Sequence, residues 1–192
     1  EVLDVLDMQL VQYGSALIQR RQTFAEELGE IVHRIHSQLS GGQEEMELKY
    51  EPNVTVDAFA QMLFSNRERD MRLKTTATGP HRDDISFVVN GVDIRKFGSQ
   101  GQQRTAALSL KLSEIELVKR LIGDTPVLLL DDVLSELDSG RQNYLLNSIE
   151  NIQTLITCTG LDEFVNHRFS INRIYKVTDG SVTVENKQEA DR

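Results

Sequence analysis

Residues 126–132 read Pro-Val-Leu-Leu-Leu-Asp-Asp, and this stretch decides the fold class. A short continuous apolar run after a proline is typical of a strand that is buried on both faces of a sheet. Ligands of open α/β sheets bind at the edge where the strands end. The stretch therefore predicts an α/β fold with a ligand site at Asp131 and Asp132.

The two acids offer a specific chemistry at that edge. Asp131 is a candidate ligand for Mg²⁺ on nucleotide phosphates, because Mg²⁺ prefers oxygen ligands. Asp132 beside it is a candidate catalytic acid that orients or deprotonates an attacking water. The alternative is a strand that ends in a solvated acidic turn, since apolar strands followed by acids are common.

A second candidate site precedes the strand, where a long helix is expected to follow Gly101. A glycine lets a backbone approach a ligand closely, and the free amides of a helix N-terminus favour an anion. Ser99 and Gln102 add side-chain donors. The alternative is an ordinary helix start with Ser99 as its N-cap, and the segment taken alone favours it. Asp138 is likewise placed as the N-cap of the helix after the strand.

Working outward, hydrophobic periodicity and turn signals divide the chain into a mainly helical part, 1–70, and an α/β part, 71–192. Gly14 is a candidate break in the first helix, and Asn90-Gly91 predicts a hairpin turn. The expected helices cover 2–39, 56–66, a long segment after Gly101, and 139–149. The expected strands cover 46–50, 73–78, 85–89, 92–94, 127–130, 154–159, and a terminal hairpin over 171–177 and 181–185.

Composition bounds the class of protein. The chain has 192 residues, of which 39% are hydrophobic, enough for one large domain or two small ones. Its single cysteine, Cys158, excludes an internal disulfide framework and fits a reducing compartment. It contains neither a signal peptide nor an apolar run of the roughly 18 residues that a membrane helix needs. Because Glu1 falls inside a helical pattern, we expect a fragment of a longer, cytoplasmic protein.

Charge gives a weaker signal. The net charge of −9 argues against nucleic acid binding, although bases outnumber acids between residues 58 and 104. On charge alone, a solvated helix face explains this basic segment better than a DNA groove does.

Three sequence blocks carry a resemblance to a known family: Thr-Gly-Pro-His-Arg-Asp-Asp at 78–84, Ser-Gln-Gly-Gln-Gln-Arg-Thr at 99–105, and Leu-Leu-Leu-Asp-Asp-Val-Leu-Ser-Glu-Leu-Asp at 128–138. Their order resembles the C-terminal half of ABC-type ATPase heads, and in detail the RecF-like ATPases of the ABC/SMC superfamily. The resemblance implies an α/β head of parallel strands plus antiparallel hairpins, occupying 71–192. It also implies that residues 1–70 are part of an inserted helical domain.

The resemblance implies a role for each motif residue. Ser99, Gly101 and Gln102 would form the signature that meets the γ-phosphate of ATP bound by a partner subunit. Asp131 would be the Walker B acid for Mg²⁺. Asp132 would occupy the catalytic-acid position, where transporters usually carry glutamate.

Other residues would lie outside the ATP site, or they differ from the motifs of ABC-type heads. Ser135 and Asp138 would belong to the D-loop that crosses the dimer interface. For His81 and Arg82, in the turn after Gly79-Pro80, the resemblance implies a contact with nucleotide or DNA, and a structural role of the histidine is the alternative. Residues 157–159 read Thr-Cys-Thr where transporter heads place a histidine, so the γ-phosphate sensor differs.

Two features bear on activity. No Gly-x-x-x-x-Gly-Lys-Ser/Thr phosphate loop occurs in the sequence, so we expect the chain alone to be inactive and its parent to be the ATPase. Residues 39–43, Leu-Ser-Gly-Gly-Gln, match the transporter signature literally. They fall at the end of a helix rather than at its start, which favours a helix stop and loop.

For the parent protein, the resemblance implies ATP and Mg²⁺ as cofactors and an ATP-dependent homodimer. It further implies gapped or double-strand/single-strand junction DNA, a RecR-type mediator partner, and work in DNA repair, recombination, replication and the SOS response. One alternative is the head of another SMC-like ATPase, disfavoured because no long heptad array occurs. The other is a non-catalytic interaction module, disfavoured by Asp131, Asp132 and the intact signature.

Overall fold

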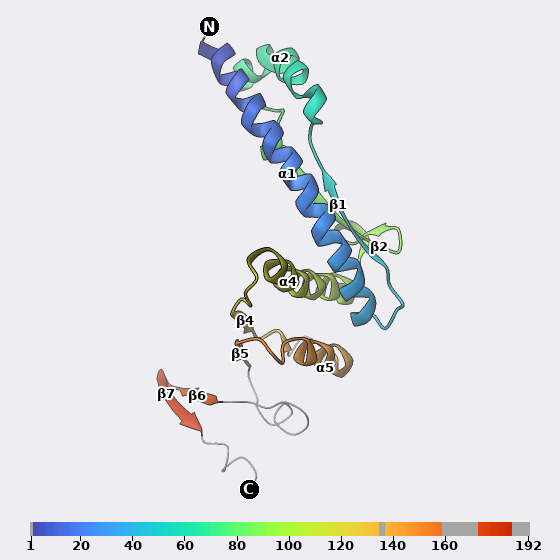
Figure 1. Ribbon diagram of the computed structural model, residues 1–192, viewed down its shortest axis with the longest axis vertical. Coiled ribbons are helices and arrows are strands. Elements are labelled where there is room, and N and C mark those ends of the chain that lie inside the picture. The colour runs from blue at the N-terminus through green and yellow to red at the C-terminus, as the bar shows by residue number, and fades with distance from the viewer. Residues whose placement is uncertain (1, 135–136, 159–172, 186–192) are drawn as a thin grey trace. The chain divides into compact units, whose positions relative to one another are not determined.

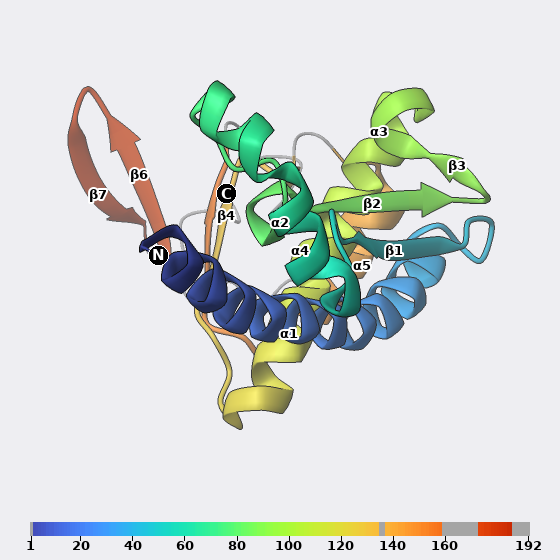
Figure 2. The same cartoon turned by 90° about the horizontal axis from the view of Figure 1, so that it is seen from above.

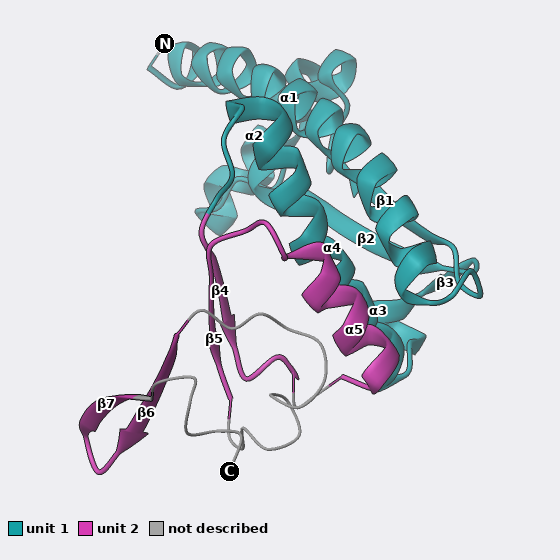
Figure 3. Ribbon diagram, turned by 60° about the horizontal axis from the view of Figure 1, so that its bottom comes forward, with its two compact units in different colours: residues 1–126 teal, residues 127–192 magenta. Residues whose placement is uncertain are grey.

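A computed structural model describes residues 2–134, 137–158 and 173–185. Contacts divide the chain into two compact units, residues 1–126 and 127–192 (Figure 3). The predicted boundary at residue 70 differs from this division, because helix α1, Val2–Leu39, packs against helix α4, Gln100–Ile122. The assignment of 1–70 to an inserted helical domain stays a prediction.

Helix α1 is the longest element of the first unit, and it lies along strand β1 and against α4 (Figures 1 and 2). Its 38 residues run without interruption, so the candidate break at Gly14 is wrong. Gly14 instead allows a close approach, since a Cβ built there would lie 2.5 Å from Cε1 of Phe59. The glycine serves the packing between α1 and α2 and does not end the helix.

The end of α1 is a tight turn. Gly41 and Gly42 have φ values of 63° and 77°, a conformation that glycine adopts without steric cost. The Gly42 amide donates to the carbonyl of Ser37 at 2.7 Å, as in a helix C-terminal cap. The interpretation of residues 39–43 as a helix stop and loop is confirmed.

The first unit contains a three-stranded antiparallel sheet in the order β1-β2-β3. Its strands are β1, Met46–Glu51, β2, Asp84–Val89, and β3, Val92–Asp93. Asn90 and Gly91 have φ values of 48° and 81°, which confirms the predicted hairpin turn. Ile94, expected in a strand, instead begins the short helix α3, Ile94–Phe97. That helix starts because the Asp93 side chain accepts a hydrogen bond from the amide of Arg95.

Helix α2 spans Val56–Leu73 and is longer than predicted. The strand expected over 73–78 is wrong, because Leu73 still belongs to the helix. Asp70 binds the backbone that follows the helix. Its carbonyl accepts hydrogen bonds from the amides of Lys74 and Thr75, and its carboxylate accepts from the amide of Ala77 at 3.1 Å. Local hydrogen bonds to one aspartate therefore override the β propensity of the threonine run.

A buried carboxylate, Asp83, joins three segments of the first unit next to the 3-10 turn η1, Pro80–Arg82. Its side chain is 3% exposed and pairs with Arg21 of α1 at 2.9 Å. It accepts further hydrogen bonds from the Tyr50 hydroxyl and, at 2.9 Å, from the amide of Asn53. The block at 78–84 thus contributes a structural joint between α1 and β1.

The second unit contains a parallel pair and an antiparallel hairpin. Strands β4, Leu128–Asp131, and β5, Thr154–Thr157, are parallel, and helix α5 spans Ser139–Ser148 between them. Strands β6, Ile174–Thr178, and β7, Ser181–Glu185, form the hairpin. The predicted combination of parallel strands and antiparallel hairpins is confirmed.

The expected burial of β4 on both faces is not seen within the described residues. Leu130 is 6% exposed but Leu129 is 71% exposed, because successive side chains of a strand point to opposite faces and the described elements cover only one of them. Among the residues that the structure describes, no helix combines the length and the apolar character needed to cross a membrane.

The joint at Asp83 makes a testable prediction about Tyr50. Burial, together with the hydrogen bond to Asp83, raises the pKa of Tyr50 to about 12 from an ordinary value of 10.0. The unfolded chain therefore loses this proton first, so the free energy of unfolding should fall as pH rises from about 10 to 12. Tyr50→Phe should remove this pH dependence and lower the free energy of unfolding at neutral pH by about 1–3 kcal/mol.

The measurement is a tyrosinate absorbance titration combined with urea unfolding. Tyr13→Phe is the control, because Tyr13 is 69% exposed. The idea fails if all four tyrosines titrate together near the ordinary value.

Candidate nucleotide-binding half-sites

The first half-site is the start of α4. Ser99 is the N-cap, and its hydroxyl accepts a hydrogen bond from the amide of Gln102 at 3.2 Å. The Gln102 side chain returns the bond, accepting from the amide of Ser99 at 3.1 Å. This reciprocal capping box confirms the helix-start interpretation, and it fixes the backbone at which an anion would arrive.

Gly101 leaves the first turn of α4 accessible. A Cβ built there would meet only the Ser99 hydroxyl oxygen, at 3.9 Å. The Gly101 carbonyl accepts from the Thr105 hydroxyl at 2.7 Å, which anchors this turn. Because the first amides of a helix have no intrahelical acceptor, the turn suits an anion such as a phosphate.

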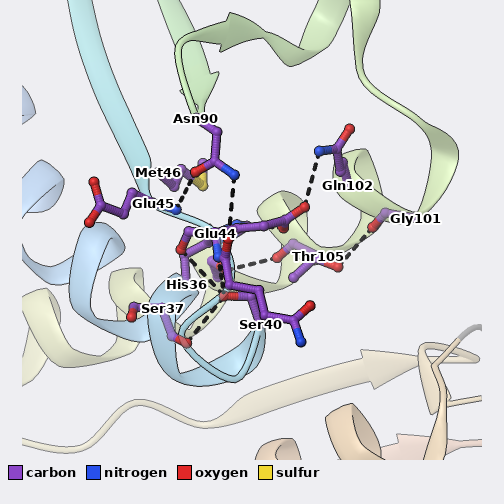
Figure 4. A network of polar contacts seen from close by, with 12 residues as sticks. His36, Ser37, Ser40, Glu44, Glu45, Met46, Asn90, Gly101, Gln102 and Thr105 are labelled. Carbon is purple, nitrogen blue, oxygen red and sulfur yellow. Dashed lines mark hydrogen bonds and ion pairs between the residues drawn. The ribbon is translucent and has the colours of Figure 1, made fainter.

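A polar chain that sequence reasoning missed leads away from the signature (Figure 4). Nε2 of Gln102 donates to the Glu44 carboxylate at 3.0 Å, and the other oxygen of Glu44 lies 3.2 Å from Nε2 of His36. Nδ1 of His36 lies 2.9 Å from the hydroxyl of Ser109. The available signal was a histidine on the apolar stripe of α1 beside Ile35, because a buried polar ring needs partners.

The second half-site is the carboxyl end of β4. Asp131 accepts a hydrogen bond from the hydroxyl of Thr157, its register partner on β5. The Asp132 amide donates to both the carbonyl and the hydroxyl oxygen of Thr157, each at 3.1 Å. Asp132 has a φ of 51°, so the chain turns sharply there. Thr157 thus contacts the carboxylate of Asp131 and the backbone amide of Asp132 at the end of the strand.

This strand end fits a magnesium ion bound with nucleotide. In the described ranges, no cluster of three or more His, Cys, Asp or Glu side chains could hold a metal alone. Magnesium usually takes only one or two carboxylates and completes its shell with water and phosphate oxygens. The exposed carboxylate of Asp131, oriented by Thr157, matches that requirement.

Of the two predicted D-loop residues, Asp138 is described and Ser135 lies outside the described residues. Asp138 is the N-cap of α5: its side chain accepts from the amide of Arg141 at 3.0 Å and forms an ion pair with the Arg141 side chain. The backbone hydrogen bond from Arg141 lowers the pKa of Asp138. The expected capping role is confirmed.

His81 and Arg82 are exposed on η1. Nε2 of His81 lies 2.7 Å from the carbonyl of Thr76, and Arg82 donates to the hydroxyl of Thr75 at 3.2 Å. These bonds fasten the segment after α2 to the turn. A nucleotide or DNA contact for either residue stays a prediction.

Several curated relatives match this chain. It is 59% identical to "DNA replication and repair protein RecF" of Lachnospira eligens over 97% of the chain and 51% of the relative. It is 59% identical to the protein of that name from Agathobacter rectalis, over 96% of the chain and 51% of the relative. It is 41% identical to the Clostridium perfringens protein of that name, over 95% of the chain and 52% of the relative. The chain thus spans about half the length of these relatives. None of the protein-family models matches it.

Solved structures match as well. One, described as "the recombination mediator protein RecF-ATP in RecFOR pathway", superposes with a TM-score of 0.82 at 33% identity. The alignment covers 96% of this chain and 50% of that one. A second, described with ATPrS in place of ATP, gives a TM-score of 0.80 at 33% identity over 95% and 50% of the two chains.

The α/β fold is therefore that of an ABC-type ATPase head, of which this chain supplies the C-terminal part. Over the half of their length that it spans, the chain is a member of the RecF family.

The cap of α5 gives a prediction about stability. Asp138→Ala should lower the free energy of unfolding by about 1 kcal/mol, because the first turn loses its side-chain acceptor. Asp138→Asn should keep most of this stabilisation, because asparagine also offers a side-chain oxygen at the N-cap. Since the pKa of Asp138 is lowered from 3.8, the charge-dependent part is present above that value and is lost as pH falls through the lowered pKa.

The comparison is urea unfolding of each variant at neutral and acidic pH. Glu150→Ala, a charge removal at an exposed position after α5, is the matched control. An equal loss in Asp138→Ala and Glu150→Ala would contradict the capping role.

Proposed function

We propose that this chain supplies half of a composite ATP site in the ATP-dependent homodimer of a RecF-type DNA-repair ATPase. The observation that carries the proposal is the match, at a TM-score of 0.82, to a RecF structure described with ATP. Of the motif residues, Ser99, Gly101 and Gln102 lie at a helix start and Asp131 and Asp132 at a strand end. Helix starts and strand ends are where phosphates and metals bind in α/β folds.

The start of α4 acts in trans in this proposal. Its first amides and the Ser99 hydroxyl meet the γ-phosphate of ATP held by the partner subunit. The accessible backbone at Gly101 supports such an approach. The helix dipole adds favourable electrostatics for an anion at this end. ATP would therefore join two subunits, because each subunit contributes one of the surfaces around the nucleotide.

The end of β4 acts on the nucleotide of its own subunit. Asp131 would hold the magnesium ion, which when bound neutralises charge on the β- and γ-phosphates. Asp132 would orient the attacking water and take its proton while the bond between the γ-phosphorus and the bridging oxygen breaks. The Thr157 hydroxyl would orient the carboxylate of Asp131 and hold the backbone of Asp132 at the turn.

The phosphate loop would come from the rest of the full-length protein, since the sequence given contains none. The proposed DNA is gapped or carries a double-strand/single-strand junction, and a RecR-type mediator is the proposed partner. The proposed DNA and mediator partner are supported by the relatives' name, which mentions DNA replication and repair, and by the description of the solved structures, which mentions the RecFOR pathway. A cytoplasmic location belongs to the same proposal, as does work in replication and the SOS response.

Asp132→Asn in the full-length protein tests the proposed catalytic acid. The variant keeps size and loses the carboxylate, so ATP binding and dimerisation should persist while turnover falls about 10²-fold or more. Steady-state hydrolysis is measured beside a nucleotide-binding titration. Asp131→Asn should instead weaken the magnesium-dependent part of binding. Unchanged turnover in Asp132→Asn would place the catalytic base elsewhere, whereas absence of turnover in the unaltered full-length protein would favour a non-catalytic module.

Ser99→Arg tests the action in trans. Sterics should outweigh charge attraction, because the phosphate must approach backbone amides that one guanidinium cannot replace. The variant should bind ATP as a monomer, fail to dimerise with a slowly hydrolysed analogue, and lose hydrolysis together with dimerisation. Sedimentation and nucleotide titration provide the two readouts.

Ser99→Thr is the control for this variant, because it keeps a hydroxyl N-cap. Normal dimerisation of Ser99→Arg, or a loss of monomeric ATP affinity, would contradict a signature that acts in trans.

A further inference from the structure

The side chain of Gln102 is held at both ends, and the second contact has no role in capping α4. Its Oε1 completes the capping box with the amide of Ser99, and its Nε2 donates to Glu44 (Figure 4). Glu44 lies in the loop after α1, 58 positions before Gln102 in the sequence. A residue far from the signature in sequence therefore controls one of the signature's side chains.

Glu44 selects the orientation of the Gln102 carboxamide. A carboxylate only accepts hydrogen bonds, and the amide of Ser99 only donates. A carboxamide turned by half a rotation would place oxygen against oxygen at Glu44 and nitrogen against nitrogen at Ser99. Only one orientation satisfies both neighbours, so the two contacts together leave the side chain no alternative.

His36 supports Glu44 from inside the protein. The ring is fully buried, and its two nitrogens lie 3.2 Å from Glu44 and 2.9 Å from the Ser109 hydroxyl. The Ser109 hydroxyl also lies 2.7 Å from the carbonyl of Thr105, which fixes it on α4. Because a carboxylate only accepts hydrogen bonds, Nε2 of His36 donates to Glu44 and holds the carboxylate in place.

The loop holds the backbone of Glu44 as well. Its amide donates to the hydroxyl of Ser40 at 3.2 Å, and that hydroxyl also lies 3.2 Å from the carbonyl of Ser37 in the last turn of α1. The next amide, of Glu45, donates to the side chain of Asn90 at 2.9 Å. Anchored on both sides, the carboxylate is pre-organised and does not have to be ordered when nucleotide arrives.

We propose that Glu44, backed by His36, is a positioning residue for the ATP signature. It holds the Gln102 carboxamide in the capping orientation, so the hydroxyl of Ser99 and the first amides of α4 face the incoming phosphate. The proposal rests on the proposed function, because it assigns Glu44 to the trans site of the dimer.

The test is ATP-dependent dimerisation of the full-length protein, followed by sedimentation against the concentration of a slowly hydrolysed ATP analogue. Glu44→Ala should raise the half-point of dimerisation about tenfold or more, the usual scale for losing a hydrogen bond to a charged group. Binding of the analogue to the monomer should not change. Glu44→Gln should leave the half-point close to that of the unaltered protein, because the carbonyl oxygen of the glutamine still accepts from Gln102.

Two variants control for charge and for folding. Glu45→Ala removes the same charge at the next, exposed position and should leave the half-point unchanged. Glu44→Asp keeps the charge but retracts the carboxylate by one methylene, so it cannot reach His36 and Gln102 together. It should raise the half-point even if Glu44→Ala proves too unstable to assay.

A double-mutant cycle separates positioning from a purely structural role. In a Gln102→Ala background, Glu44→Ala should cause no further shift of the half-point, because the group that Glu44 positions is gone. A lower melting temperature with an unchanged half-point would overturn the proposal. An equal shift with and without Gln102 would overturn it too.

Ser99→Arg distinguishes this proposal from the one on which it rests. If Ser99→Arg blocks dimerisation while Glu44→Ala and Glu44→Asp do not shift its half-point, the positioning role alone has failed. If Ser99→Arg dimerises normally, the trans site has failed and the role of Glu44 fails with it.

Discussion

The packing of α1 against α4 is the constraint on which the first unit depends. The apolar stripe of α1 supplies the burial, but apolar contacts alone tolerate sliding of one helix along another. His36 removes that freedom, because a fully buried ring must find a partner for each nitrogen. Ser109 on α4 and Glu44 in the loop provide them. The same bonds that set the register of the two helices therefore also reach the start of α4.

Elements with a strong local signal were predictable from the sequence. The stripe of α1, the Asn90-Gly91 turn and the apolar run of β4 each depend on residues adjacent in the chain. The misses depend on partners distant in sequence or on one competing side chain. Gly14 is explained only by the ring of Phe59, and the lost strand after α2 only by the hydrogen bonds of Asp70. Exposure of Leu129 follows from which sheet face is covered, which periodicity does not encode.

The candidate site divides in the same way. Motif order placed Ser99 at a helix start and Asp131 at a strand end, because capping and strand termination are local properties. The contacts that hold those residues were not visible, since Gln102 meets Glu44 and Asp131 meets Thr157 only after folding. A sequence motif identifies the groups that would face a ligand. The groups that orient them belong to other elements, and they lie at no fixed distance from the motif in the sequence.

The left-handed backbone at Asp132 limits which amino acids that position can accept. With a φ of 51°, it favours glycine, asparagine and aspartate, whose small or short side chains tolerate this conformation. Of these three, only aspartate carries a negative charge. Glutamate, the acid that transporter heads usually place there, would bring a longer side chain into an unfavourable backbone geometry. At Asp132 the shape of the turn and the carboxylate of the proposed catalytic acid are therefore provided by the same residue.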